Sequence, residues 1–405
     1  MSLFPDSNIA IEEFNYALPA ERIARYPLSR RDEAKLLVYQ KGQIRHVRFK
    51  QLPDLLGKED LLIINNTRVI QARVLFTKPS GANIEIFCLE PVDPSGYELS
   101  FSSTHSVAWK CLIGNAKKWR NGALVKSVGA ISLTAVQIKK AGGEWIIRFT
   151  WDPVELTFSE VLEQTGKTPI PPYLNRESES SDKTNYQTVY SRYKGSVAAP
   201  TAGLHFTEEV LQNLIVKGIQ HMELTLHVGA GTFRPIIDAD VGKHPMHAEH
   251  IYFGREELHR LLTWENDIVA VGTTTARTLE SIYWLGCKVI IDDGILPEDL
   301  NLSQWEAYNL DHTGKYESLT ALSDYFERNG IERFETTTEL MIVPGYTFRM
   351  VNKLITNFHQ PKSTLLLLVS AFIGNDWKEV YRYALDNDFR LLSYGDTSLL
   401  IPNNE

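Results

Sequence analysis

The stretch DIVAVGTTTARTLESIYWLG, residues 267–286, joins a short apolar run to a longer pattern of mixed apolar and polar residues. Residues 267–272 have the length and composition of a buried strand, and residues 273–286 are predicted to continue from it as a helix. Helix and strand patterns alternate in the same way at residues 207–228 and 377–401. This alternation is typical of a layered α/β domain.

A different pattern occupies residues 73–150, where short strand-like runs are separated by Gly, Asn, Ser or Asp and no helix is expected. The runs are NIEIFCLE (83–90), YELSFSS (97–103), VAWKCLI (107–113), ISLTAVQI (131–138) and EWIIRFTW (144–151). Short strands at regular spacing are typical of an antiparallel barrel or sandwich. We therefore expect a small all-β domain, residues 73–150, inserted into an α/β domain of residues 1–72 and 151–405.

The composition excludes several classes of protein. Of the 405 residues, 43% are hydrophobic and 23% are charged, which is ordinary for a globular protein. The three cysteines are too few and too widely spaced for a disulfide framework or a Cys-based zinc site. No secretory signal is apparent at the N-terminus, and the longest apolar stretch, residues 365–374, is too short to cross a bilayer. We expect a cytoplasmic protein without a membrane partner.

Charge is distributed unevenly along the chain, whose net charge is −8. Residues 287–338 hold eleven acidic and four basic residues, whereas residues 73–150 hold ten basic and five acidic residues. A locally basic module in an acidic protein can bind phosphates, because the local field governs contact. The alternative is a basic but merely solvated sheet surface.

Three polar or glycine-rich motifs follow predicted strands or precede helices. NNTRV (65–69) ends a strand, so Arg68 is a candidate for binding a carboxylate or phosphate, or else forms a structural salt bridge. The small residues of GSVAAPTAGLHFT (195–207) would let a flat ligand approach the backbone closely. Alternatively, they serve only tight packing within the protein. TLHVGAGTFRPI (225–236) is not a dinucleotide fingerprint, because Pro235 replaces the expected helix start.

Three further motifs carry histidines or hydroxyl groups. HPMHAEH (244–250) indicates an acid–base pair, with a structural cluster or a metal site as alternatives. VGTTTARTLES (271–281) offers hydroxyl and amide groups to an anion, or is an ordinary helix cap. TNFHQPKSTLLLLVSAF (356–372) places polar residues before the most apolar strand candidate of the chain.

Together these motifs resemble the S-adenosylmethionine:tRNA ribosyltransferase-isomerase family of queuosine biosynthesis. The matching stretches follow the family order: NNTRVIQAR (65–73), PIPPYL (169–174), YQTVY (186–190), SVAAPTAGLHFT (196–207), TLHVGAGTF (225–233), HPMHAEH (244–250), VGTTTARTLES (271–281), VPGY (343–346), TNFHQPKSTLLLLVSAF (356–372) and SYGD (393–396). The acidic segment 287–338 is longer than this family pattern leads us to expect, and we treat it as an insertion in the α/β domain.

The resemblance implies a layered α/β sandwich domain with an inserted small antiparallel β-barrel domain. It implies transfer and isomerisation of the ribosyl group of S-adenosylmethionine onto 7-aminomethyl-7-deazaguanine at the wobble position of tRNA. The product is epoxyqueuosine-tRNA, with adenine and methionine released. No metal or other cofactor is implied, since S-adenosylmethionine is a consumed substrate. We expect a monomer that binds tRNA through its barrel.

Proton transfer, substrate binding and tRNA binding are assigned to residues of these motifs. The candidates for proton transfer are His227, His247, Glu249 and His359. The candidates for substrate binding are Arg68, Thr201, Gly203, His205, Gly229, Gly231, Thr273 and Thr274. The candidates for tRNA binding are Lys117, Lys118 and Arg120, with Trp119 stacking on a base.

Two other functions remain open on the sequence. A non-catalytic RNA-binding protein on the same scaffold would bind tRNA without consuming S-adenosylmethionine. A metallohydrolase built on the histidines of residues 244–250 would contain a metal ion.

Overall fold

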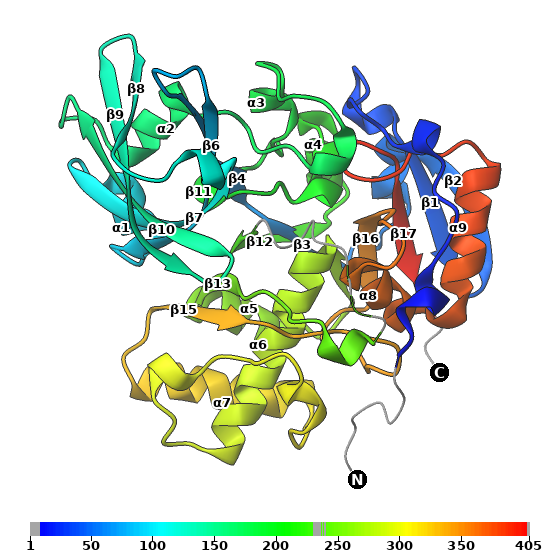
Figure 1. The fold of residues 1–405 in the computed structure, drawn as a ribbon. Helices are drawn as coiled ribbons and strands as arrows, with labels where there is room; N and C mark the ends of the chain where they lie inside the picture. The colour runs from blue at the N-terminus through cyan, green and yellow to red at the C-terminus, as the bar shows by residue number, and fades with distance from the viewer. Residues whose placement is uncertain (1–8, 230–235, 237, 239, 403–405) are drawn as a thin grey trace.

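The computed structural model describes residues 9–229, 236, 238 and 240–402. Its main element is a mixed nine-stranded sheet with the strand order β15-β13-β12-β3-β14-β16-β17-β1-β2 (Figure 1). The strands are β1 (Lys35–Gln40), β2 (Gln43–Arg48), β3 (Leu61–Asn65), β12 (Gln220–His227), β13 (Glu249–Gly254), β14 (Ile268–Val271), β15 (Arg333–Thr338), β16 (Lys353–Asn357) and β17 (Thr397–Ile401). The central strands β12, β3, β14 and β16 run parallel to one another.

Both faces of this sheet are covered, because side chains of the central strands alternate between two cores. Leu61 and Ile63 of β3 pack into one core with helices α6 (Thr273–Ile291), α8 (Thr364–Ile373) and α9 (Trp377–Asp386). Leu62 and Ile64 pack into a second core with helix α4 (Glu208–Val216). The continuous apolar run of β3 predicts a central strand that is buried on both faces. The α/β sandwich is therefore confirmed.

The inserted domain is a six-stranded antiparallel sheet that curls into a nearly closed barrel, with the order β5-β6-β7-β10-β9-β8. Its edge strands β5 and β8 contact each other. The strands are β5 (Arg73–Thr77), β6 (Asn83–Asp93), β7 (Ser106–Gly114), β8 (Leu124–Val128), β9 (Ile131–Ala141) and β10 (Glu144–Asp152). Helix α2 (Phe158–Thr165) seals one end, where Phe158 contacts Trp109 and Trp151. The predicted barrel is confirmed.

Two segments that were expected to be strands are helices. YELSFSS forms helix α1 (Tyr97–Ser102), because Tyr97 and Phe101, one helical turn apart, both pack on Trp109, while Leu99 is 64% exposed. The apolar run after Ser363 forms α8, whose first turn is capped by the Ser363 hydroxyl. Periodicity cannot distinguish a buried helix from a buried strand when nearly every position is apolar.

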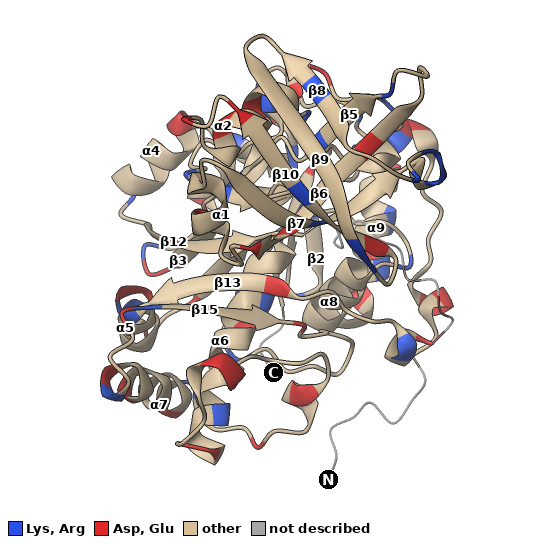
Figure 2. Cartoon of the chain, turned by 60° about the vertical axis from the view of Figure 1, so that its left-hand side comes forward, with Lys and Arg blue, Asp and Glu red and all other residues tan. Residues whose placement is uncertain are grey.

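Residues 287–338 belong to the layers of the α/β domain rather than to a separate lobe. Helix α6 continues through Ile291, and α7 (Lys315–Arg328) packs against both α6 and α5 (Arg255–Thr263). Strand β15 pairs antiparallel with β13 at the sheet edge. Figure 2 marks acidic residues in and around α7 and basic residues on β9 and β10 of the barrel.

Candidate active site

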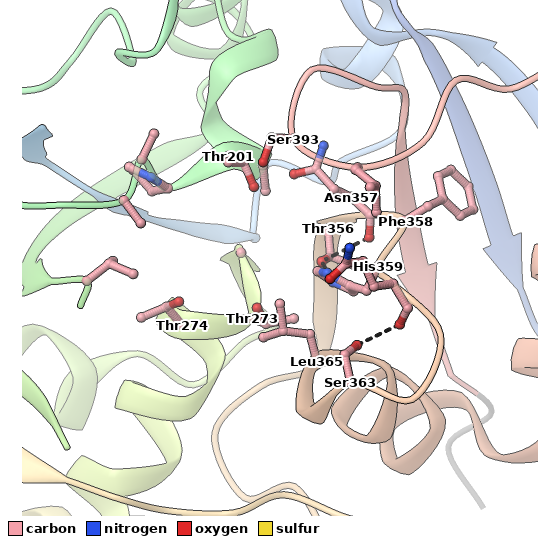
Figure 3. Close-up of a pocket in the computed structure, with 18 of the residues that line it drawn as sticks. Thr201, Thr273, Thr274, Thr356, Asn357, Phe358, His359, Ser363, Leu365 and Ser393 are labelled. Atoms are coloured by element: carbon pink, nitrogen blue, oxygen red, sulfur yellow. Dashed lines mark hydrogen bonds between the residues drawn. The ribbon is translucent and has the colours of Figure 1, made fainter. Parts of the chain in front are cut away.

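A cavity lies at the carboxyl ends of the parallel strands β14 and β16, where open α/β sheets commonly bind ligands. It encloses about 770 Å³, counting its open mouth. Six of the quoted sequence motifs contribute to it, and four of the predicted residues are in the wall: Thr201, Thr273, Thr274 and His359 (Figure 3). The lining residues are Tyr173, Ala198 to Ala202, Val228, Val271 to Thr275, Thr356 to Gln360, Ser363, Leu365, Leu392 and Ser393.

The amino end of the 19-residue helix α6 forms one wall of this cavity. Gly272 precedes the helix with φ +96°, a conformation that favours glycine, and it makes no side-chain cap. Backbone N–H groups in the first turn of a helix have no partner within the helix, and the helix dipole adds a partial positive charge there. This wall is therefore suited to a carboxylate or another anionic group.

His359 lies in the opposite wall and is held by hydrogen bonds on both its ring and its backbone. Its Nε2 is 2.8 Å from the Thr356 hydroxyl, and its backbone N–H donates to the Tyr381 hydroxyl at 3.0 Å. Burial lowers the pKa of His359 to about 3, so the imidazole is neutral at physiological pH. It can exchange hydrogen bonds with a ligand without bringing a charge.

The described lining of this cavity contains no Asp, Glu, Lys or Arg side chain. Its polar groups are hydroxyls, amides and one imidazole, and they are interleaved with alanines, leucines and aromatic rings. A small number of polar groups in an apolar concave wall is typical of sites for small organic ligands. The first cavity is therefore suited to a neutral planar group such as a nucleobase with its ribose.

A second, wider cavity of about 1190 Å³ lies where the barrel domain meets the α/β domain. It is lined by α1, by the start of α2, by β11 (Tyr193–Ser196) and by β12. Its rim carries the cations Arg192, Lys194 and Arg333 together with the carboxylates Glu98 and Glu160. Tyr193 is half exposed at the same rim. A basic and aromatic opening of this kind is suited to a nucleotide.

His227 is the buried histidine of the second cavity. It stacks on Tyr97 with ring centroids 4.4 Å apart and meets Tyr252 edge-on at 5.0 Å. Burial, with a smaller contribution from His250, lowers the pKa of His227 to about 3. Its Nδ1 has no hydrogen-bond partner among the described residues, and Gly195 leaves just enough space for the ring.

Consecutive residues at the end of β12 line the two cavities. His227 lines the second cavity, and Val228, the next residue, lines the first. Because consecutive side chains of an extended chain point to opposite sides, one short segment separates the two spaces.

His247 and Glu249 are brought together as predicted, but neither lines the two cavities. Nε2 of His247 is 3.3 Å from the carboxylate of Glu249, which also forms a buried ion pair with Arg277 of α6. Burial raises the pKa of Glu249, but Arg277 and His247 outweigh that effect and bring it to about 2. The carboxylate is therefore ionised at neutral pH and is not a proton donor.

Three predicted substrate-binding residues lie away from the first cavity. Arg68 is exposed and lines a small pocket on the outer surface, opposite Lys194 in the pairing of β11 with β4 (Thr67–Val69). Gly203 packs so closely on the Tyr190 hydroxyl that a Cβ would lie 2.0 Å from it. His205 is buried behind the wall, with Nε2 3.4 Å from Nδ2 of Asn357.

The two glycines that follow β12 were candidates for substrate binding, and neither is among the described lining residues of the two cavities. Gly229 follows Val228 but lines neither cavity. Gly231 lies outside the described residues.

The predicted tRNA-binding cluster is basic and exposed, with one exception. The side chains of Lys117, Lys118 and Arg120 are exposed at one end of the barrel. Trp119 is only 2% exposed, and its Nε1 donates to the backbone oxygen of Gly122 at 2.9 Å. The expectation that Trp119 stacks on a base is therefore wrong, because the indole is buried in the barrel core.

Sequence reasoning missed Asn357, Tyr97 and Arg277. Asn357 belongs to the quoted motif that begins TNFHQ. Its position as a polar residue at the carboxyl end of a strand could have identified it. Tyr97 was assigned to a strand, and Arg277 gave no local signal on its helix.

Within the described residues, no cluster of three or more His, Cys, Asp or Glu side chains is arranged to hold a metal ion. No described helix is both long enough and apolar enough to cross a membrane.

Comparison with known proteins places this chain in a family. Residues 11–400 match the model of the family described as queuosine biosynthesis protein. A relative from Trichlorobacter lovleyi, named S-adenosylmethionine:tRNA ribosyltransferase-isomerase, is 36% identical to this chain. The alignment covers 96% of this chain and 99% of the relative. One of the same name from Magnetococcus marinus is 35% identical, with 97% of its length and 100% of this chain covered.

A solved structure from Thermotoga maritima, titled as an S-adenosylmethionine tRNA ribosyltransferase, is 28% identical, with a TM-score of 0.46. The alignment covers 96% of this chain and all of that one. From the family match and the near-complete coverage of relatives more than 30% identical, we conclude that the chain belongs to the queuosine biosynthesis protein family.

Proposed function

We propose that this chain is an S-adenosylmethionine:tRNA ribosyltransferase-isomerase. It transfers and isomerises the ribosyl group of S-adenosylmethionine onto 7-aminomethyl-7-deazaguanine in tRNA, giving epoxyqueuosine-tRNA, adenine and methionine. The observation that carries this proposal is that the consecutive residues His227 and Val228 line two different cavities. A reaction between a small nucleoside donor and a nucleotide of tRNA needs two adjoining spaces of this kind.

S-Adenosylmethionine is assigned to the first cavity. The uncharged, hydroxyl-rich wall accommodates the adenosyl group, and the amino end of α6, with Thr273 and Thr274, accommodates the methionine carboxylate. The neutral imidazole of His359 is a candidate to hydrogen-bond a ring nitrogen of the leaving adenine. Adenine leaves poorly unless a ring nitrogen is protonated or hydrogen-bonded, so such a group contributes to the transition state.

The modified base is assigned to the second cavity, where His227 and Tyr252 provide aromatic lining and Tyr97 stacks on His227. The aminomethyl group must be neutral to attack the ribose, and a neutral imidazole at His227 can accept a hydrogen bond from it. Arg192 and Lys194 at the rim, with the exposed cations of the barrel, are positioned to contact phosphates.

Glu249 acts indirectly in this proposal. Its ionised carboxylate, fixed by Arg277, orients His247 and keeps the first turns of α6 in place. We therefore regard Glu249 as a positioning residue. His247 stays a candidate for proton transfer, after His227 and His359.

We further propose that the enzyme works without a metal or organic cofactor, as a monomer in the cytoplasm. The tRNA substrate supports the cytoplasmic location.

The decisive test is incubation of the protein with S-adenosylmethionine and tRNA carrying 7-aminomethyl-7-deazaguanine. We expect epoxyqueuosine by nucleoside mass spectrometry, with one adenine released per modified tRNA. Binding of tRNA without adenine release would instead identify a non-catalytic RNA-binding protein.

A further inference from the structure

Asn357, the last residue of β16, has an unsatisfied hydrogen-bond acceptor at the first cavity. The residue is 3% exposed, and its Oδ1 has no hydrogen-bond partner in the described part of the chain. Figure 3 shows its carboxamide projecting across the cavity toward Thr201 and Ser393. A buried acceptor without a partner costs free energy, so its retention at a ligand cavity indicates that a ligand donates to it.

His205 fixes which end of this carboxamide faces the cavity. The ring presents Nε2 to Asn357, and because an amide nitrogen can only donate, Nε2 is the acceptor of the hydrogen bond between them. Nδ2 of Asn357, at 3.4 Å, is the matching donor. The ring is held in place by Phe49, with centroids 5.3 Å apart, and burial lowers the pKa of His205 to about 3, which keeps it neutral.

We propose that Asn357 determines specificity for adenine by accepting a hydrogen bond from its exocyclic amino group, and that His205 is a positioning residue that keeps Oδ1 directed at the ligand. This inference rests on the proposed function, because it assigns one contact within the proposed S-adenosylmethionine site.

Two features favour the adenine amino group over the methionine ammonium group as the donor. No carboxylate is present in the described wall to neutralise an ammonium ion. The same cavity is also lined by Ala198, Ala199 and Leu392, which present apolar surface to a planar ring. Replacing the 6-amino group by a 6-oxo group would set two acceptor oxygens against each other.

The experiment compares S-adenosylmethionine with its 6-oxo analogue, S-inosylmethionine, by equilibrium binding and by turnover with the modified tRNA precursor. Wild type should prefer S-adenosylmethionine by at least about 30-fold, since a mismatched buried acceptor is costly. Asn357→Ala should reduce that preference to within about threefold, because the acceptor is gone. Asn357→Asp retains acceptor oxygens, so a preference of about tenfold or more should remain.

His205→Phe tests positioning separately from structure. Phenylalanine keeps the ring packing on Phe49 but removes the Nε2 acceptor, so the Asn357 carboxamide is free to rotate and present Nδ2. The 6-oxo analogue should then bind about tenfold more tightly than it binds wild type, a gain that mere structural damage would not produce. His259→Gln, on the exposed surface of α5, is the matched control and should leave the preference unchanged.

The outcomes separate this inference from the proposed function. Turnover of S-adenosylmethionine with an unchanged preference in both Asn357→Ala and His205→Phe would overturn the inference alone. Absence of any S-adenosylmethionine binding by the wild-type protein would overturn both. An analogue bound as tightly as S-adenosylmethionine by wild type would also overturn the inference.

Discussion

Tyr97 of the barrel domain stacks on His227 of the α/β domain, with ring centroids 4.4 Å apart. The contact joins the inserted domain to the end of β12, where His227 lines the second cavity. The position of the barrel and the orientation of the candidate histidine are therefore coupled through one pair of rings.

Disrupting this stack should impair turnover more than binding of S-adenosylmethionine. We expect Tyr97→Ala to lower kcat by about tenfold to a hundredfold, since a misplaced catalytic group is costly. Tyr97→Phe keeps the ring and should stay within about threefold of wild type. Adenine release under saturating tRNA measures kcat, and equal losses in the two variants would contradict a role for the ring.

The Glu249–Arg277 ion pair should behave as a buried pair. Arg277→Met leaves a buried carboxylate without its main counter-charge and should lower the free energy of unfolding by about 3–5 kcal/mol. The double variant Glu249→Gln/Arg277→Met removes both charges and should be less destabilised. Urea unfolding of the four proteins of this cycle gives the coupling energy, and additive losses would exclude direct coupling.

Exposed barrel cations should set the salt dependence of tRNA binding. We expect the triple variant Lys117→Ala, Lys118→Ala and Arg120→Ala to make the slope of log affinity against log salt shallower by about 0.7–0.9 for each phosphate that is no longer neutralised. Arg328→Ala, on the acidic surface of α7, serves as the control. An identical slope in the triple variant and wild type would remove this end of the barrel from the tRNA interface.

Trp119 should matter for stability rather than for RNA binding. Trp119→Phe removes the donor to the Gly122 carbonyl and should lower the free energy of unfolding by about 1–3 kcal/mol. Thermal unfolding measures this loss. The affinity for tRNA at a temperature well below unfolding should match wild type. A large drop in that affinity would instead show that Trp119 contacts the tRNA.

Acid should destabilise the fold through three buried histidines. His205, His227 and His359 each have a pKa of about 3 in the folded state, below the ordinary value of 6.5. Between those values the unfolded chain binds more protons than the folded one, so stability is present at neutral pH and falls as pH drops from about 6.5 toward 3.

Each of these histidines contributes up to about 1.4 kcal/mol per pH unit in that window. Urea unfolding at pH 7, 6, 5 and 4 measures the slope. His205→Phe should make it shallower, whereas the exposed-site control His259→Gln should not. The same slope of stability against pH in wild type, His205→Phe and His259→Gln would contradict this account.

The sequence by itself determined the layered architecture and most of the first cavity. Continuous apolar runs such as residues 61–66 predict strands buried on both faces, and Thr273 and Thr274 follow such a strand at its carboxyl end. Because carboxyl ends of parallel strands share one edge, motifs far apart in sequence converge there without knowledge of the packing.

Tertiary structure alone decided what each polar side chain faces. His205 and Trp119 have the same local appearance as ligand-binding residues, yet one lies behind Asn357 and the other inside the barrel. The helix at Tyr97 and the partnership of Arg277 with Glu249 likewise depend on contacts across more than ten residues of sequence. Side-chain burial and partner choice are set by long-range packing, which no local pattern of residues encodes.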